Sequence, residues 1–271
     1  MRGRVLIIAG SDSGGGAGIQ ADIKTVTMLD AYAATAITAL TAQNTEGVFG
    51  VLPIPPDFIR RQIEVVLDDI GTDAIKTGML HDATVIEAIA AVLQKRAAGI
   101  PLVVDPVMVA KGGARLIDPD ALEALKRLLI ARADILTPNL PEAEILCGAT
   151  IGDTADMRAY GETLLALGCR AVLVKGGHLS GEVVSDVLVT NAGARVWESP
   201  RIATRHTHGT GCTLASAIAA GLAQGLDIET AVDQARVYVQ RAIASAPGLG
   251  RGHGPLNHAH PLRGAQPAPN G

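Results

Sequence analysis

Short runs of consecutive apolar residues alternate along the chain with longer segments in which apolar residues recur every three or four positions. The first run covers residues 4–10 (RVLIIAG), and a segment with helical spacing follows over residues 17–30. Continuous apolar runs of this length are typical of strands buried on both faces, and the helical spacing predicts a helix packed against them. The chain therefore begins with a strand, a loop and a helix.

The same alternation continues through most of the sequence. Further strands are predicted at residues 34–42, 73–78, 101–105, 133–139 and 171–177, and further helices at 56–70, 82–97, 118–133 and 141–148. Residues 183–190 and 194–199 predict a hairpin around Asn191 and Gly193, and two helices follow between residues 210 and 246. The pattern predicts an α/β fold: a mostly parallel central sheet with helices on both faces, and a small β-hairpin.

The composition of the chain bears on its number of domains and on its possible partners. No apolar run approaches the roughly eighteen residues that cross a bilayer, and no linker interrupts the middle of the 271-residue chain. We expect one domain over residues 1–260 and a flexible tail over residues 261–271. The 23 basic and 27 acidic residues are mixed along the chain, without the basic stripe that nucleic acids select. Nucleic acid and membrane are therefore not expected as partners.

The cysteines and aromatic residues add two expectations. Cys147, Cys169 and Cys212 are odd in number and far apart, and the N-terminus reaches a glycine too soon for a signal peptide, so we expect a cytoplasmic protein. Only six residues are Phe, Trp or Tyr, so aliphatic side chains are expected to line any pocket.

Ligands of an open parallel sheet bind beyond the carboxyl ends of its strands, and the loops expected there are rich in chemistry. The loop from Gly10 to Gly18 holds five glycines in nine residues. Such a loop permits close approach to a ligand and leaves N–H groups at a helix start. A tight turn between a strand and a helix is the alternative interpretation.

A second glycine-rich turn, HGTGCT, precedes a helix of small residues. Gly209 and Gly211 allow close approach, Thr210 is the expected N-cap, and the first N–H groups of the helix favour an anion. Cys212 lies in the first turn, where the helix dipole is expected to lower the pKa of its thiol. The alternatives are a capped structural helix and a buried, unreactive cysteine, which is the interpretation we give to Cys147 and Cys169.

Polar residues at other strand ends have two interpretations each. Asn139 and Glu142 are spaced to meet Mg²⁺ waters and phosphate oxygens, or to form a capping box, and both can hold together. Lys175, after an apolar strand, is expected to meet phosphate charge. Asp105 and Asp22 are candidates for a metal or a hydroxyl, or for ordinary caps and surface charges. His258 and His260 lack matching metal-ligand partners and are interpreted as tail residues.

The loops taken together resemble a known family. In order and spacing, the chain from about Val5 to His260 resembles the hydroxymethylpyrimidine and phosphomethylpyrimidine kinases of thiamine biosynthesis, a branch of the ribokinase-like family. The segments that carry the resemblance are AGSDSGGGAGIQADIKT, TALTAQNTEGV, KTGML, DPVMVAKGG, TPNLPEAE, VKGGH and HGTGCTLASAIAA. Gly112 and Gly113 depart from the pattern, since many relatives have serine and glycine there.

The resemblance implies a ribokinase-like enzyme that uses ATP and Mg²⁺ to phosphorylate 4-amino-5-hydroxymethyl-2-methylpyrimidine and then its monophosphate. It implies a pyrimidine site formed by Gln43, which hydrogen-bonds the ring, by the walls Gly10, Met79 and Val107, and by Asp22. It implies a nucleotide site at Asn139, Glu142, Lys175 and Gly209, with the metal near Glu142 and Asp105. Thr210 and Gly211 then present amides to the transferred phosphate, and Cys212 replaces the aspartate base of most relatives, as a base or as a polar partner.

Three alternatives stay open. A pyridoxal or pyridoxine kinase of the same family differs at the ligand edge that faces Gln43. A transferase or hydrolase with Cys212 as nucleophile would need a general base, for which His206 and His208 are near in sequence. A nucleotide-binding module would bind without turnover. The resemblance also implies a homodimer.

Overall fold

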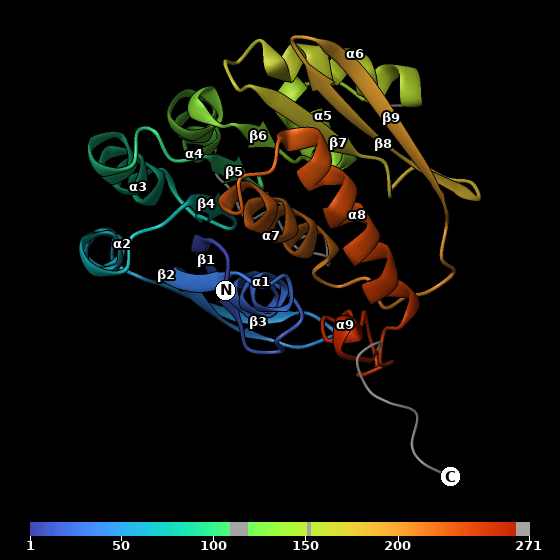
Figure 1. Ribbon diagram of the computed structural model, residues 1–271, viewed down its shortest axis with the longest axis horizontal. Coiled ribbons are helices and arrows are strands. Elements are labelled where there is room, and N and C mark those ends of the chain that lie inside the picture. The colour runs from blue at the N-terminus through green and yellow to red at the C-terminus, as the bar shows by residue number, and fades with distance from the viewer. Residues whose placement is uncertain (109–118, 151–152, 264–271) are drawn as a thin grey trace.

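Nine strands form one sheet in the computed structural model, which describes residues 1–108, 119–150 and 153–263 (Figure 1). Their order is β3-β2-β1-β4-β5-β6-β7-β8-β9. The strands are β1 (Arg4–Asp12), β2 (Tyr32–Gln43), β3 (Val48–Pro53), β4 (Ala74–Thr77), β5 (Leu102–Val104), β6 (Ile135–Leu136), β7 (Ala171–Lys175), β8 (Val183–Thr190) and β9 (Gly193–Pro200).

The middle of this sheet is parallel and its two edges are antiparallel. Strands β2, β1, β4, β5, β6 and β7 run parallel to their neighbours. Strand β3 pairs antiparallel with β2, and β7, β8 and β9 pair antiparallel in turn. The β8–β9 pair closes where Thr190 faces Gly193, as the sequence predicts for the hairpin.

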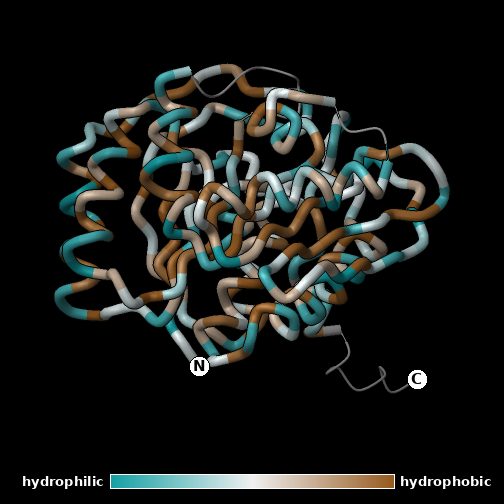
Figure 2. The backbone as a smooth tube through the Cα atoms, turned by 90° about the horizontal axis from the view of Figure 1, so that it is seen from above, coloured by the Kyte–Doolittle hydropathy of each residue, from teal (hydrophilic) through white to brown (hydrophobic). Residues whose placement is uncertain are grey.

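Helices cover both faces of the sheet, which confirms the predicted fold class. One face carries α1 (Gly18–Met28), α7 (Thr210–Ala223) and α8 (Ile228–Ala244), which lie side by side in Figure 1. The other face carries α2 (Pro56–Asp69), α3 (Ala83–Arg96), α4 (Pro119–Ala124), α5 (Leu140–Cys147) and α6 (Thr154–Leu165). Apolar residues gather in the interior between these layers (Figure 2).

Strand β1 shows why its sequence is a continuous apolar run. Leu6 and Ile8 belong to the core beneath α2 and α3, whereas Val5 and Ile7 belong to the core beneath α1, α7 and α8. All four side chains are fully buried. Successive side chains of a strand point to opposite faces, so a strand covered on both sides has no polar face to alternate with.

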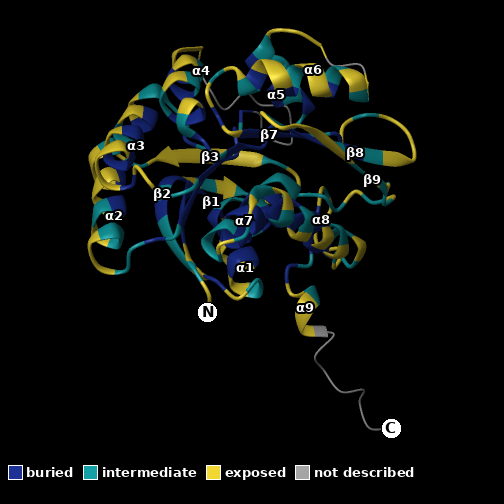
Figure 3. Cartoon of the chain, turned by 45° about the horizontal axis from the view of Figure 1, so that its top comes forward, coloured by how far each residue is buried: buried dark blue, intermediate teal, exposed yellow. Residues whose placement is uncertain are grey.

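Strand β3 and helix α6 were not predicted from the sequence. Every residue of β3 is exposed, because this edge strand packs its side chains against no helix layer (Figure 3). Without a buried face its sequence, VFGVLP, shows no alternation of apolar and polar positions. Helix α6 begins with a capping box between Asp153 and Asp156, and it buries only Met157, Gly161 and Leu164, so its apolar stripe is thin.

Other boundaries differ in detail. The single helix predicted over residues 118–133 consists of α4, a π-helical turn over Leu125–Leu129 and a 3-10 turn over Ile130–Arg132. A one-turn helix, α9 (His260–Arg263), includes the first residues of the predicted tail. Gly112 and Gly113 lie outside the described residues, as do residues 264–271, and the division into domain and tail stays a prediction. Where the structure describes the chain, no helix is both long enough and apolar enough to cross a membrane.

Candidate active site

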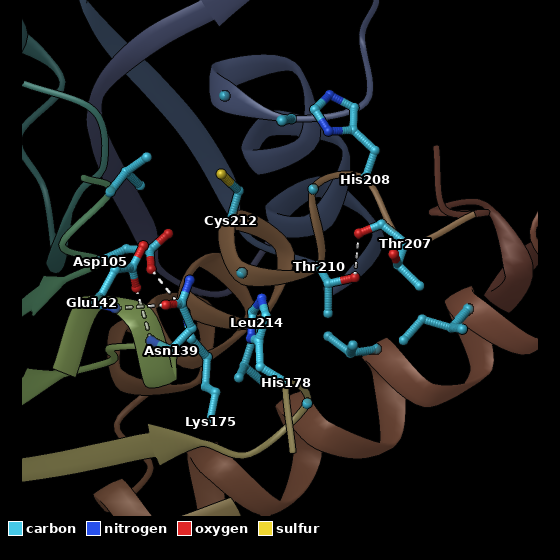
Figure 4. Close-up of a pocket in the computed structure, with 18 of the residues that line it drawn as sticks. Asp105, Asn139, Glu142, Lys175, His178, Thr207, His208, Thr210, Cys212 and Leu214 are labelled. Atoms are coloured by element: carbon cyan, nitrogen blue, oxygen red, sulfur yellow. Dashed lines mark hydrogen bonds and ion pairs between the residues drawn. The ribbon is translucent and has the colours of Figure 1, made fainter. Parts of the chain in front are cut away.

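A cavity of about 760 Å³ lies at the carboxyl ends of the parallel strands, where the sequence predicts the ligand site. Asp22 does not line it, but the other predicted site residues do. They are Gly10, Gln43, Met79, Asp105, Val107, Asn139, Glu142, Lys175, Gly209, Thr210, Gly211 and Cys212. Figure 4 shows Asp105, Asn139, Glu142 and Lys175 grouped on one side of Cys212 and His208 on the other.

The N-terminus of α7 is one wall of this cavity. The N-cap is Gly209 rather than the predicted Thr210, because φ of +83° at Gly209 suits glycine and a Cβ there would collide with the carbonyl oxygen of Gly16. The Thr210 hydroxyl instead donates to the carbonyl of Thr207 at 2.8 Å. The intrahelical ladder begins at the N–H of Thr213, which donates to the Gly209 carbonyl at 2.9 Å. The first-turn N–H groups of Gly211 and Cys212 therefore precede the ladder at the cavity wall.

A lysine and an aspartate face the same helix terminus. Lys175 Nζ lies 3.1 Å from Asp105 Oδ1, with both side chains nearly buried. A Cβ on Gly211 would lie 3.2 Å from Lys175 Nζ, so the ammonium group and the helix N-terminus converge. Burial opposes the charge, but Asp105 and Glu142 outweigh it and raise the pKa of Lys175. Positive charge and N–H donors at one point favour a phosphoryl group.

Asn139 and Glu142 form the predicted capping box at the start of α5. The Asn139 N–H donates to Glu142 Oε2 at 2.8 Å, and the Glu142 N–H donates to Asn139 Oδ1 at 2.9 Å. Burial raises the pKa of the Glu142 carboxyl to about 7, although Lys175 opposes that rise. The box leaves both side chains on the cavity wall, so capping and ligand contact are compatible here.

The thiol of Cys212 differs from the prediction. Burial raises its pKa to about 12, and the charges of Asp22 and Asp105 act in the same direction, whereas Lys76 opposes them. The expected lowering by the helix dipole is therefore wrong, because desolvation and nearby carboxylates dominate. Near neutral pH the Cys212 side chain is an S–H group in the cavity wall.

Asp22 lies behind the cavity rather than in it. Its carboxylate pairs with Lys76 Nζ at 2.9 Å, with both side chains fully buried, and it accepts a hydrogen bond from the Ser216 hydroxyl at 2.7 Å. Asp22 is thus neither a cap nor a surface charge. Lys76 does line the cavity. Sequence reasoning missed Lys76, although a lysine inside the apolar strand DAIKTG was a usable signal.

The glycine-rich loop is held by an aspartate that the sequence analysis did not select. Asp12, at the end of β1, accepts from the N–H groups of Gly14 at 2.8 Å, Gly16 at 3.1 Å and Ala17 at 2.8 Å. These three amides belong to the turn itself and are satisfied inside the protein. The loop is therefore a tight turn held by Asp12, and the first-turn N–H groups of α1, which begins at Gly18, are not among those that Asp12 binds.

The same aspartate connects the glycine loop to His208 and Gln43. Asp12 Oδ2 lies 2.9 Å from His208 Nε2, which in turn lies 3.3 Å from the side-chain nitrogen of Gln43. His208 and Gln43 both line the cavity. His208 appeared in the sequence analysis only as a possible partner of Cys212, whereas the structure pairs it with Asp12.

The chain beyond α8 packs against the segment that follows Gln43. The His253 N–H donates to the Thr45 carbonyl at 2.8 Å, next to Gln43, and a Cβ on Gly252 would collide with the Thr45 backbone. His258 is buried, and its Nε2 lies 2.9 Å from the Thr213 hydroxyl. Burial lowers the pKa of His258 to about 4. The interpretation of His258 as a tail residue is therefore wrong.

The cavity extends from the helix terminus to an apolar end that the sequence did not reveal. Arg236 and Asp186 form an ion pair of 2.8 Å at its edge. The aliphatic side chains at this end are Val184, Ile202, Leu214, Val239 and Ile243. They come from β8, the segment after β9, and helices α7 and α8, so no single motif could have indicated them.

The side chains that line the cavity also indicate which kind of metal ion could bind there. No group of three or more His, Cys, Asp or Glu side chains suited to a metal occurs among residues 1–108, 119–150 and 153–263. The carboxylates of Asp105 and Glu142 nevertheless share the cavity. Mg²⁺ bound to nucleotide phosphates needs only one or two protein carboxylates and keeps several waters. The donor set fits such an ion and does not fit a metal held by protein alone.

A mostly parallel α/β sheet, with a cavity of this kind between strand ends and a helix N-terminus, defines a small-molecule kinase of the ribokinase-like class. The model of the phosphomethylpyrimidine kinase family matches residues 12–257. The chain belongs to the phosphomethylpyrimidine kinase family.

Two relatives illustrate the match. The thiamine biosynthesis bifunctional protein ThiED of Geobacter sulfurreducens is 54% identical over 95% of this chain and 52% of its own length. The chain thus spans about half of that relative. The hydroxymethylpyrimidine/phosphomethylpyrimidine kinase of Bacillus subtilis is 46% identical over 94% of both chains.

A solved structure agrees with the fold. The pyridoxal kinase of Bacillus subtilis, as an ADP complex, has a TM-score of 0.90 and 38% identity, and the match covers 97% of this chain and 99% of that one. The family and the structural likeness together make this chain a kinase that uses ATP.

Proposed function

We propose that this protein transfers the γ-phosphoryl group of ATP to the hydroxymethyl group of 4-amino-5-hydroxymethyl-2-methylpyrimidine, and then to the resulting monophosphate. The observation that carries the proposal is the convergence of Lys175, the N-terminus of α7 and Gln43 on one cavity. Phosphoryl transfer depends chiefly on positioning and on stabilising charge on the transferring group, and these elements supply both.

The pyrimidine occupies the end of the cavity near the glycine loop. The side-chain amide of Gln43 can donate to a ring nitrogen while accepting from the exocyclic amine. Gly10, Met79 and Val107 form the walls around the ring. A Cβ on Gly10 would collide with the methyl group of Met79, so the absence of a side chain there lets the thioether pack across the pocket. Gly10 thereby shapes the ring pocket.

The phosphates lie between the pyrimidine and the apolar end. The N–H groups of Gly211 and Cys212, beside Thr210 and the Gly209 cap, present donors to the transferred phosphoryl group, and Lys175 neutralises its charge. The apolar end, lined by Val239 and Ile243, receives the adenine ring.

Mg²⁺ is the metal we propose for the nucleotide. Glu142 and Asn139 would hold its waters, with Asp105 as the second carboxylate. When bound, the ion neutralises charge on the phosphates. The capping box holds Glu142 in place for this role, because Glu142 pairs with Asn139, the N-cap residue of α5.

Cys212 contributes an S–H group to the reaction. Because its pKa is raised to about 12, the thiol is a poor base at neutral pH, and we assign it as the polar partner that orients the substrate hydroxyl. The loose transition state of phosphoryl transfer requires little prior deprotonation of that hydroxyl. The same raised pKa argues against Cys212 as a covalent nucleophile.

The test is to incubate the protein with Mg-ATP and the pyrimidine and to identify the products by mass. Formation of the monophosphate and then the diphosphate supports the proposal. Absence of both refutes it, and binding of ATP without turnover indicates a nucleotide-binding module. Retention of ATP-dependent phosphorylation by Cys212→Ala or Cys212→Asp would exclude the covalent alternative.

Pyridoxal or pyridoxine phosphorylation is the second candidate, and the structural likeness to a pyridoxal kinase favours it. Measuring ADP release with each substrate distinguishes the two. A clear preference in kcat/KM for the pyridine substrates would replace the pyrimidine assignment. Comparable values would make the enzyme a kinase of both vitamin precursors.

We further propose a cytoplasmic homodimer. Free cysteines at positions 147, 169 and 212 suit a reducing compartment. Phe49 and Leu52 of the edge strand β3, and Phe58 of α2, are large apolar side chains exposed to solvent, which suits a contact between subunits. Sedimentation equilibrium would show a dimer, and Phe49→Lys with Leu52→Lys would weaken it.

A further inference from the structure

The Gln43 amide lies in a chain of polar contacts that the proposed reaction does not by itself require. Its Nε2 lies 3.3 Å from His208 Nε2, and its Oε1 lies 3.1 Å from the Thr41 hydroxyl. His208 Nε2 also lies 2.9 Å from Asp12 Oδ2. The Thr41 hydroxyl lies 3.0 Å from the carbonyl oxygen of Ser11. These contacts decide which way the amide faces.

The imidazole nitrogen nearest the amide carries a hydrogen. Burial opposes ionisation of Asp12, but the hydrogen bonds from His208 and from backbone N–H groups outweigh it and hold the pKa of Asp12 below its usual range. A carboxylate that is ionised at neutral pH needs a donor at 2.9 Å, so Nε2 of His208 bears the proton. An amide NH₂ group that faced this N–H would place a donor against a donor.

The contacts of Thr41, on the other side of the Gln43 amide, indicate the same orientation of the amide. Its hydroxyl has one hydrogen, and both the Ser11 carbonyl and the amide oxygen are within reach of it. A backbone carbonyl can only accept, whereas the amide can present either its oxygen or its nitrogen. If the hydroxyl donates to Ser11, the amide nitrogen must face Thr41. A half-turn of the Gln43 amide about its last torsion removes both conflicts.

We propose that His208 is a positioning residue that fixes the Gln43 amide with Oε1 toward the imidazole and Nε2 toward Thr41. The single hydrogen on His208 Nε2 is then shared between Asp12 Oδ2 and, at the longer distance, one lone pair of Oε1, and one N–H of Gln43 donates to the Thr41 hydroxyl. One acceptor site and one donor site remain side by side for the ligand, in a fixed order. The order selects a ring edge with a donor on the His208 side and an acceptor on the Thr41 side.

This inference rests on the proposed function and sharpens its substrate class. In a 4-aminopyrimidine the exocyclic amine is the donor, and the neighbouring ring nitrogen is the acceptor. With the amine on the His208 side, the adjacent hydroxymethyl arm also lies on that side, nearer Gly209 and the start of α7. The reversed amide would select the reversed edge, which a 4-oxopyrimidine with hydrogen on the ring nitrogen presents with its arm still on the His208 side. The 4-amino compound could meet the reversed amide only with its arm turned away.

The imidazole is itself held in place. A Cβ on Gly16 would collide with Cδ2 of His208, so the glycine loop packs directly against the ring. His208 is also paired with Pro255 through a backbone bridge. The bridge fixes the backbone that carries the imidazole and the packing against Gly16 restricts rotation of the ring, so the direction of its N–H is fixed before a ligand arrives.

The test compares two substrates across three proteins. The substrates are the 4-amino pyrimidine and its 4-oxo analogue. The proteins are the wild type, His208→Leu, which lacks the donor, and His208→Gln, which returns an N–H near the position of Nε2. His253→Leu is the matched control, because His253 is exposed and lies outside the cavity lining.

We expect wild type to prefer the amino compound by about 100-fold or more in kcat/KM, since the wrong edge leaves two buried polar groups mispaired. His208→Leu should reduce that preference below about 10-fold, with the KM for ATP within about twofold of wild type. His208→Gln should restore most of the preference, and His253→Leu should retain it.

These outcomes distinguish failure of the positioning role of His208 from failure of the proposed function. A wild-type preference retained in His208→Leu, even at lower overall activity, overturns the positioning role, because loss of packing alone lowers both substrates together. Loss of preference that His208→Gln fails to restore also overturns it. If wild type phosphorylates neither pyrimidine, the proposed function itself fails.

Discussion

The ammonium group of Lys76 and the carboxylate of Asp22 lie 2.9 Å apart, with both side chains fully buried beneath the cavity. Burial works against the charge on Lys76, yet the carboxylates of Asp22 and Asp105 raise its pKa. The Ser216 hydroxyl adds a third partner to the carboxylate. This ion pair joins β4 to α1 and α7, which are the elements that carry the cavity floor and its phosphate-facing wall.

Asp22→Asn should destabilise the protein by about 3–5 kcal/mol, because it leaves the Lys76 ammonium buried without a countercharge. Urea denaturation gives the free energy of unfolding. Adding Lys76→Met to Asp22→Asn should recover part of the loss, since the uncompensated charge is then removed. An Asp22→Asn protein within about 1 kcal/mol of wild type, which is the typical cost of a point mutation of any kind, would contradict the importance of the pair.

Cys212 should alkylate slowly at neutral pH. Iodoacetamide reacts with thiolate, and a thiol with a pKa of about 12 holds far less thiolate at pH 7.5 than an ordinary cysteine. We expect the rate, followed by mass mapping of the Cys212 peptide, to rise about tenfold per pH unit up to the limit of protein stability. A plateau below pH 9 would show a lower pKa and would reopen the role of the thiol as a base.

Glu142 should make stability depend on pH. Its folded pKa, about 7, lies above the unfolded value, so its favourable contribution is complete at pH values below about 4.3 and declines as pH rises through 7. Glu142→Gln retains a capping side chain but cannot ionise. The unfolding free energy of wild type relative to Glu142→Gln should therefore fall by on the order of 2 kcal/mol between pH 4.5 and pH 8. Parallel stability curves for the two proteins would refute the raised pKa.

Lys175→Met should lower kcat by about 10²–10³-fold, because the transferring phosphoryl group loses its nearest positive side chain. The KM for the pyrimidine should change little, since Gln43 lies at the other side of Cys212. Lys175→Arg should not restore the rate, because the planar guanidinium is larger than the ammonium group that fits between Asp105 and Gly211. Lys95→Met, on the exposed end of α3, is the control and should match wild type. A Lys175→Met enzyme within threefold of wild type would remove Lys175 from the phosphate site.

Gly209→Ala should disrupt the start of α7 more than its backbone angle alone explains. Gly209 and Gly225 have φ of +83° and +85°, but a Cβ at Gly209 meets the Gly16 carbonyl whereas one at Gly225 meets open space. Gly225→Ala should cost about 1 kcal/mol in unfolding free energy, from the positive φ. Gly209→Ala should cost at least about 1–3 kcal/mol more, from the clash, and should abolish turnover. Equal losses of unfolding free energy in the two variants would show that the loop at Gly16 moves away from the added Cβ without cost.

The sequence allowed prediction of the elements whose faces are buried. Strand β1 and helix α3 are apolar where they meet the core, and the period of those positions identified them. Strand β3 has no buried face and helix α6 buries few residues, so neither leaves a strong periodic signal. The rule that ligands bind at strand ends located the cavity, because it depends on topology alone.

Within the site, we could predict residues whose role depends on neighbours in the sequence. We could not predict residues whose role depends on side chains that are close only in the folded protein. The capping box of Asn139 and Glu142 is a local pattern, and the structure contains it. The protonation of Cys212 depends on burial and then on Lys76, Asp22 and Asp105, which come from three other parts of the chain, so a rule about helix termini gave the wrong direction. Asp12 and His208 were not predicted as partners, because neither residue is distinctive in the sequence and only the fold brings them into contact.

Asp12 and His208 are 196 residues apart in the chain, yet their contact joins the substrate wall of the cavity to its phosphate wall. Contacts between such distant positions form after local structure, since closing a long loop costs entropy before it gains any interaction. Helices and inner strands can therefore assemble without any site being present. We therefore expect catalytic competence to be a late event in folding, and recovery of ligand binding to lag behind recovery of helical structure during refolding.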